Sequence, residues 1–173
     1  MPVRRLLTTL TLLPVLAVVP PGAPVAAPAP APAAPATALW ALPLAGTPEV
    51  TRPFAPPPTP YAAGHRGVDL AAAPGVPVLA AGAGTVVFAG AVAGRPVVSV
   101  DHPGGLRTTY EPVAPTVAAG QVVALGTPLG ALATGHAGCP AAACLHWGLR
   151  RGEVYLDPLS LLRPPRVRLL PWD

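Results

Sequence analysis

The sequence predicts an all-β fold, a single small domain of antiparallel strands around one core. Short segments rich in Val and Thr recur between residues 76 and 149, and Gly or Pro bounds each of them, which is typical of strands joined by turns. The chain of 173 residues contains 28 Pro and 18 Gly, residues that interrupt helices. No stretch of about 12 residues has the apolar spacing of a helix.

The expected elements follow one another along the chain. We expect strands at residues 76–80, 85–89, 96–102, 106–110 and 145–149, with one or two more between residues 122 and 132. Pro103-Gly104-Gly105 is predicted to join two of these strands as a hairpin. Asp157 is the expected cap of a short helical turn, with Pro158 in its first turn.

Both ends of the chain are expected to lie outside the domain, which we place at residues 39–165. Arg4 and Arg5 precede an apolar stretch and a run of small residues, which together predict a secretory signal peptide at residues 1–27. An uncleaved membrane anchor is the alternative, for which the stretch is short and interrupted by Pro. The remaining segments are an expected Pro/Ala-rich spacer at 28–38 and a tail at 166–173. The protein is therefore expected to be secreted or associated with the cell wall, with no stable membrane insertion after cleavage.

The charge of the chain is mildly basic. All 11 basic residues are Arg, and the net charge is +4, of which Arg4 and Arg5 would leave with the signal peptide. This excess suits contact with an anionic cell wall, although a solvated basic surface is the simpler explanation. Because no run of Arg is interleaved with aromatic residues, no nucleic-acid partner is predicted.

Three residues are candidate metal ligands: His65, Asp69 and His146. If residues 64–69 are extended, alternation places His65, Gly67 and Asp69 on one face, where Gly67 leaves room for an ion. Two imidazoles and one carboxylate form a zinc ligand set that leaves a fourth position for water, as in catalytic sites. The alternative is that each histidine is a hydrogen-bonded polar residue on a sheet.

Five short segments carry these residues and their surroundings in a fixed order. They are His65-Arg66-Gly67-Val68-Asp69-Leu70, Pro74-Gly75-Val76-Pro77-Val78, Gly84-Thr85-Val86-Val87, Val100-Asp101-His102 and Leu145-His146-Trp147. The series resembles the lysostaphin-like (LytM-like) zinc metalloendopeptidases, which cut peptide cross-links or stems of bacterial cell walls. That resemblance, which extends from about Trp40 to Leu162, implies an open groove over a β-sheet, bound Zn²⁺ and peptidoglycan peptides as partners; we expect a monomer. The family's ligands, the two residues of His-x-x-x-Asp and the second His of a later His-x-His, match His65, Asp69 and His146.

Two positions depart from the family pattern. The family's His-x-His reads Cys144-Leu145-His146 here, and its Tyr-x-His reads Tyr110-Glu111-Pro112. In the family both of the missing histidines lie outside the metal sphere and orient the bound water or the developing oxyanion. The resemblance therefore supports the fold and the metal more directly than it supports turnover.

Two other residues are candidates for part of the missing catalytic role. His136 lies in a Gly-bounded loop that is expected to fold over the groove, although a solvated loop histidine is the simpler interpretation. Tyr110 is expected to reach the groove as a hydrogen-bond donor, and alternation then places Glu111 on the opposite face. His102 is expected to make a structural hydrogen bond at the end of a strand.

Cys139 and Cys144 are expected to form a disulfide, because an exported chain with an even number of cysteines favours one. The bond would fix the entry of the strand that carries His146, on which Leu145, Trp147 and Leu149 are expected to face the core. An alternative is that Cys144 binds the metal as a thiolate and closes a structural site. Cysteine nucleophilic catalysis is a third interpretation, which needs a thiolate that an oxidised pair lacks.

Three functions from different classes remain. The first is a secreted zinc endopeptidase, in which zinc-activated water attacks a peptide carbonyl. The second is a degenerate domain that binds wall peptides or regulates another hydrolase, and the third is a structural-zinc or metal-free scaffold. The ligand set favours the first over the third, whereas the lost histidines favour the second over the first. A biotinyl or lipoyl carrier, which residues 120–130 resemble, is excluded because the chain has no Lys for cofactor attachment.

Overall fold

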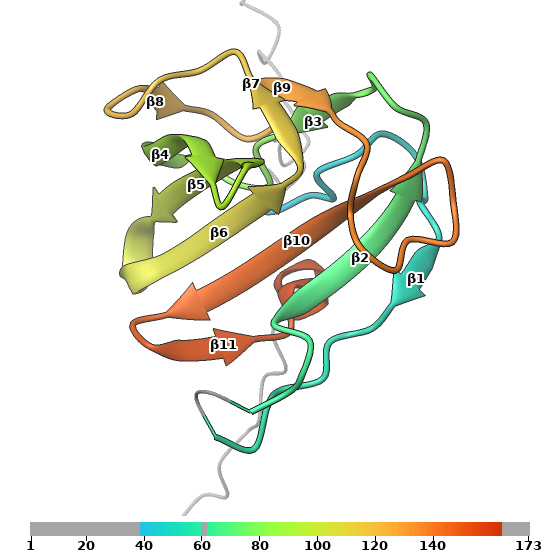
Figure 1. Ribbon diagram of the computed structural model, residues 1–173. Coiled ribbons are helices and arrows are strands. Elements are labelled where there is room, and N and C mark those ends of the chain that lie inside the picture. The colour runs from blue at the N-terminus through green and yellow to red at the C-terminus, as the bar shows by residue number, and fades with distance from the viewer. Residues whose placement is uncertain (1–38, 60–61, 164–173) are drawn as a thin grey trace, which may run out of the picture. The chain divides into compact units, whose positions relative to one another are not determined.

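The computed structural model describes residues 39–59 and 62–163. This part of the chain contains eleven short strands (Figure 1). The strands are β1 (Val50–Arg52), β2 (Gly67–Ala72), β3 (Pro77–Leu79), β4 (Gly84–Val92), β5 (Arg95–His102), β6 (Leu106–Glu111), β7 (Val113–Pro115), β8 (Val122–Val123), β9 (Pro128–Leu132), β10 (Ala143–Arg151) and β11 (Val154–Leu156). Two 3₁₀ turns, η1 (Pro103–Gly105) and η2 (Pro158–Leu162), complete them. The all-β prediction is confirmed.

The predicted ends of the chain lie outside the described residues. These are the signal peptide at 1–27, the spacer at 28–38 and the tail at 166–173. Within residues 39–59 and 62–163, no helix has the length and apolarity that crossing a membrane requires.

Two antiparallel sheets make up the domain. The larger has the strand order β1-β2-β10-β6-β5-β4-β8, and β11 also pairs with β10, beyond the end of β2. The smaller has the order β3-β9-β7. Figure 1 shows β10 running between β2 and β6, so the strand predicted to carry His146 is an interior strand of the larger sheet.

The core is built by the alternation of β10 and its neighbours. Leu145, Trp147 and Leu149 are buried, as predicted, while His146 and Arg150 point to the other face and are partly exposed. Trp147 is the largest of the fully buried side chains among the described residues. A side chain of this size dominates the apolar area that a small core removes from water.

The strands predicted at residues 76–80, 85–89, 96–102, 106–110 and 145–149 are confirmed as β3, β4, β5, β6 and β10, and the region around Gly126 supplies β8 and β9. The hairpin is confirmed at η1, where Gly104 and Gly105 have φ of 76° and 73°, a conformation that favours glycine. Asp157 caps η2, since its Oδ1 accepts a hydrogen bond of 3.0 Å from the Leu159 backbone N–H. The sequence did not predict β1, β7 and β11, which have three residues each.

Candidate metal centre

The three predicted ligands converge at one point on the exposed face of the larger sheet. Asp69 on β2 stands directly opposite His146 on β10. Asp69 Oδ1 lies 2.9 Å from both His65 Nε2 and His146 Nδ1, and these two nitrogens are 3.1 Å apart. The separations are close to the edge of a tetrahedron, about 3.3 Å, for zinc bonds of about 2.0 Å.

His65 reaches this point from a loop rather than from β2. The expected extended segment 64–69 bends at Arg66, and β2 begins only at Gly67. His65 forms an isolated bridge with Ala55, and its Nδ1 lies 2.7 Å from the Pro53 carbonyl oxygen. Because a carbonyl only accepts, Nδ1 carries the hydrogen, so in a neutral His65 the Nε2 lone pair faces Asp69.

This arrangement suits a cation better than it suits hydrogen bonds alone. A neutral His65 directs an acceptor nitrogen at Asp69 Oδ1, so these two acceptors repel each other unless a positive charge lies between them. A metal ion would satisfy all three atoms at once. The Pro53 carbonyl behind His65 is the type of outer partner that fixes a ligating imidazole.

Asp69 is held in its ionised form. Its burial, with only 3% of the residue exposed, would raise the pKa of the carboxyl. The hydrogen bond from His146 and the electrostatic influence of His136, His65 and His146 outweigh this effect and lower the pKa of Asp69 to about 2. The carboxylate is therefore available as a ligand at neutral pH.

Gly67 makes room for a ligand, although not in the way that the sequence suggested. A Cβ at this position would lie 2.8 Å from His146 Cε1 and Nε2 and would also meet the Trp147 carbonyl. Such contacts are too close for any side chain. Gly67 thus clears space for the imidazole of His146, which in turn faces the proposed ion.

The family of the chain follows from residues 63–158, more than half of its length, which match the model of peptidase family M23. The chain belongs to peptidase family M23. It is 57% identical over 133 residues to the uncharacterized protein Rv2891 of Mycobacterium tuberculosis. The aligned region covers 75% of this chain and 53% of that relative. The chain thus spans about half the length of the curated relatives it matches.

Solved structures share the M23 fold with this chain. Csd3 of Helicobacter pylori is similar with a TM-score of 0.61 and 26% identity, over 77% of this chain and 37% of that protein. Lysostaphin of Staphylococcus simulans is similar with a TM-score of 0.60 and 23% identity, over 73% of this chain and 55% of that protein. The lysostaphin-like resemblance inferred from the sequence is confirmed.

Cys144 occupies the position that corresponds, by the resemblance, to the first histidine of the family's His-x-His, and it forms a disulfide. Cys139 and Cys144 are bonded, with their Cα atoms 5.6 Å apart, so the disulfide prediction is confirmed. Cys144 therefore offers neither a thiolate ligand nor a nucleophile, and those two alternatives are wrong for the structure described. The bond joins the loop after β9 to β10, two residues before His146.

The expectation for Tyr110 is wrong. This side chain is fully buried, where its hydroxyl accepts a hydrogen bond of 2.9 Å from the Ala81 N–H and lies 2.9 Å from Thr108 Oγ1. Burial raises the pKa of Tyr110 to about 12, against the lowering effect of these hydrogen bonds. Tyr110 belongs to the core and cannot donate into the groove.

Glu111 consequently faces the groove, contrary to the expectation that it points away. It stands opposite His146 in the register of β6 and β10, and its Oε1 lies 3.0 Å from Arg95 Nη1. The alternation itself was predicted correctly, but it was assigned to the wrong faces. The polar residues at every second position of β6, Arg107, Thr109 and Glu111, were the signal that identifies the outer face.

His136 lies beside the three ligands, on the loop between β9 and β10. Its Nε2 is 3.2 Å from Asp69 Oδ2, and its ring stacks on that of His146 with centroids 5.7 Å apart and planes 20° apart. The contact with Asp69 lacks hydrogen-bond geometry, and neither ring nitrogen has a hydrogen-bond partner among the described residues. The structure therefore places a polar group without a geometric hydrogen bond at the edge of the ligand cluster.

Proposed function

We propose that the protein is a secreted zinc metalloendopeptidase that cuts peptides of peptidoglycan, with His65, Asp69 and His146 as the zinc ligands. The convergence of these three side chains within 3.1 Å of one another is the observation that carries the proposal. Membership of peptidase family M23, whose members are typically zinc metallopeptidases, supports it. The proposed organisation remains a signal peptide at 1–27, a spacer at 28–38, the domain at 39–165 and a tail at 166–173, acting as a monomer.

Zinc bound at these residues would polarise the scissile carbonyl and bring the pKa of a bound water to about 7. The protein's own contribution begins with the orientation of the ligands. The Pro53 carbonyl fixes the tautomer of His65, and Asp69 remains ionised at neutral pH. The peptide would lie along the groove face of β10 and β6, on the side of His146 that is partly exposed.

We assign proton transfer to His136. Its Nε2 lies 3.2 Å from Asp69 Oδ2, at the edge of the ligand cluster, where it could accept a proton from the attacking water and pass it to the leaving amine. The family's two non-ligand histidines are replaced by Cys144 and Pro112, so His136 would take over part of their role. The Cys139–Cys144 bond restrains the loop that carries His136.

A second candidate function is a domain that keeps the zinc and binds wall peptides, or regulates another hydrolase, without cutting. The replacement of both family histidines favours it. Slow or absent hydrolysis together with tight peptide binding would distinguish it from the peptidase.

The decisive experiment incubates zinc-loaded protein that lacks residues 1–27 with purified peptidoglycan and assays for new free amino groups. We expect release by the unmodified protein and none by His65→Ala. A protein that contains one zinc, binds the wall and releases no amino groups would overturn the peptidase proposal in favour of the binding domain. A protein that holds no zinc would overturn both.

A further inference from the structure

The edge strands of the two sheets differ in how well they resist the addition of a further strand. β1, β3, β7 and β11 have three residues each, and a proline lies within or directly beside β1, β3 and β7. β4 is the exception, because its nine residues, Gly84–Val92, include neither proline nor a charged side chain. Proteins commonly protect a sheet edge by shortness, proline or charge, and β4 has none of these three.

Only the first part of β4 has a neighbour on the side away from β5. β8 pairs with the first two residues of β4, and Val86 exchanges backbone hydrogen bonds of 2.8 Å with Gly120 and Gln121. A bulge follows between Val86 and Phe88. Residues 88–92, called the β4 edge below, pair one to one with β5, and no other strand in the described part of the chain pairs with them.

The backbone groups of Ala89 and Ala91 point out of the β4 edge. In an antiparallel pair, residues that exchange hydrogen bonds with their partner alternate with residues that do not. Ala91 stands opposite Pro96, which has no N–H, so this pair exchanges none, and the alternation makes Ala89 and Val98 the next such pair. The N–H and C=O groups of Ala89 and Ala91 therefore face away from β5, where they are available to an added strand.

Apolar side chains accompany these backbone groups on the groove face of the sheet. Phe88 and Val92 are 38% and 49% exposed, and both border a hollow that reaches Thr109 and Glu111 on β6. The Phe88 ring lies beside Gly90, since a Cβ at Gly90 would be 3.3 Å from Phe88 Cζ. The β4 edge thus combines outward backbone groups with an apolar surface that runs along it.

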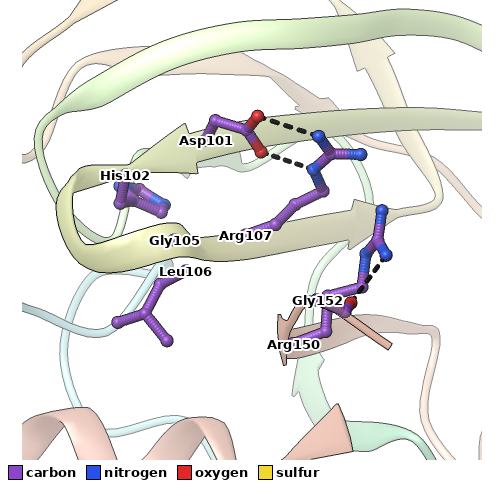
Figure 2. Close-up of a pocket in the computed structure, with 7 residues that line it drawn as sticks. All are labelled: Asp101, His102, Gly105, Leu106, Arg107, Arg150 and Gly152. Atoms are coloured by element: carbon purple, nitrogen blue, oxygen red, sulfur yellow. Dashed lines mark hydrogen bonds and ion pairs between the residues drawn. The ribbon is translucent and has the colours of Figure 1, made fainter. Parts of the chain in front are cut away.

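The charged side chains nearby belong to β5 and β6 and are paired with one another. Figure 2 shows Arg107 on β6 joined to Asp101 on β5 through two contacts, of which Nη2 to Oδ2 is 2.8 Å long. Arg95 on β5 is joined to Glu111 on β6 at 3.0 Å. Because β4 itself carries no charge, an uncharged partner is the one that complements its edge.

We propose that the β4 edge binds an extended, uncharged segment of another protein, which adds to the larger sheet as a further strand. An extended polypeptide presents N–H and C=O groups at the spacing of those of Ala89 and Ala91, and its alternate side chains would pack on Phe88 and Val92. Proline is excluded where the added strand must donate an N–H. β5 and β6 separate β4 from β10 in the strand order, so this interaction is independent of the proposed zinc chemistry.

The test uses a capped peptide of alternating Thr and Val, about six residues long as in a typical strand. Its control is the same peptide with a methyl group on every backbone nitrogen, which removes all its N–H donors. NMR titration of the protein without residues 1–27 gives the affinities, and amide hydrogen exchange locates the contact. The saturating peptide should slow exchange at Ala89 and Ala91 at least about fivefold, the effect of one typical hydrogen bond, and leave Gly90, whose N–H faces β5, unchanged.

Ala91→Pro removes an outward N–H without removing a hydrogen bond to β5, because Ala91 and Pro96 exchange none. It should weaken binding of the peptide about fivefold. Val92→Lys should also weaken binding, and Val154→Lys is its matched control, because Val154 is a valine on β11 that is 63% exposed. The methylated peptide tests the same hydrogen bonds on the unmodified protein, which guards against misfolding of the variants.

Four results would overturn the proposal. They are equal affinities for the two peptides, equal effects of Val92→Lys and Val154→Lys, slow amide exchange of Ala89 and Ala91 in the protein alone, and a dimer of the protein alone that Ala91→Pro dissociates. The third would mean that the chain itself covers the β4 edge. The fourth, measured by analytical ultracentrifugation, would assign the edge to a second copy of this chain.

Discussion

Two clusters that contain histidine lie at the larger sheet, one around His102 and one formed by His65, Asp69 and His146, and only the second has the donor set of a candidate metal site. His102, at the end of β5, donates from Nδ1 to the Ala83 carbonyl at 2.8 Å, and its Nε2 lies 2.7 Å from Thr108 Oγ1. Thr108 continues the network to the Tyr110 hydroxyl. Every polar atom in this group faces a complementary partner, as expected for a polar network inside a core.

The ligand cluster differs in how its partners face one another. His65 Nε2 and Asp69 Oδ1 are both acceptors when His65 is neutral, yet they are 2.9 Å apart. Burial alone does not separate the two groups, because His65 and His102 are both buried. We infer that acceptors converging on one point mark a candidate metal site, whereas alternating donors and acceptors mark a structural histidine.

The largest expected effect is loss of the metal from the ligand cluster. His146→Ala should lower the affinity for zinc at least about a hundredfold, since even outer partners of ligands contribute about 10–100-fold. His102→Gln should retain about one zinc per chain. Elemental analysis and competition with a chelator measure both, and equal zinc affinities for the two variants would erase the distinction between the groups.

A large effect on turnover is expected at His136. If this residue transfers the proton, His136→Gln should slow peptide hydrolysis by about 10²–10⁴ while the zinc content stays unchanged. The zinc content is the control, because His136 also contacts Asp69. Unchanged hydrolysis in this variant would show that another group accepts the proton.

A smaller effect concerns the disulfide beside the cluster. The paired substitution Cys139→Ser with Cys144→Ser opens a loop between residues that are 5 apart in sequence and should lower the free energy of unfolding by about 2 kcal/mol. Chemical denaturation of both proteins gives this difference. Equal denaturation midpoints and slopes would mean that the bond contributes nothing to stability.

The smallest effect is a dependence of stability on pH that arises from His102. Burial lowers the pKa of His102, against the opposing effects of the Ala83 carbonyl and Asp101. The unfolded chain, with a pKa near 6.5, therefore binds the proton first as the pH falls. The contribution of neutral His102 is complete above about pH 6.5 and decreases below it, by at most about 1.4 kcal/mol per pH unit.

His102→Gln should remove this part of the slope. The free energy of unfolding of the metal-free protein and of the variant should be measured by denaturation between about pH 5 and pH 8, a range around the ordinary histidine pKa of about 6.5. The two pH dependences then give the contribution of His102. Parallel stability curves for the two proteins would contradict the assignment of His102 as a buried neutral group.

The sequence predicted the structure well where residue types follow a regular spacing along the chain. Alternation on β10 placed Trp147 inside and His146 outside, and the ligand spacing identified His65, Asp69 and His146 before any geometry was known. The approach of His65 to Asp69 depends on a bend at Arg66 and on the Pro53 carbonyl, which no local pattern reveals.

The sequence was least informative where a tyrosine has two plausible environments. Tyr110 is amphipathic, so its type fits either face of β6, and the choice depends on tertiary partners such as the Ala81 N–H. Assigning it to the groove also turned Glu111 away from the groove.

The pairing of β10 has a consequence for how this chain can vary. His146 stands opposite both Asp69 and Glu111, while Trp147 lies between Val68 and Tyr110. A slip of one residue along β10 would bring the indole into the groove and the imidazole into the core, so folding and ligand geometry would fail together. An inserted or deleted residue within this strand is therefore far more damaging than most single substitutions there. The same strand register determines both the packing of the core and the positions of the ligands.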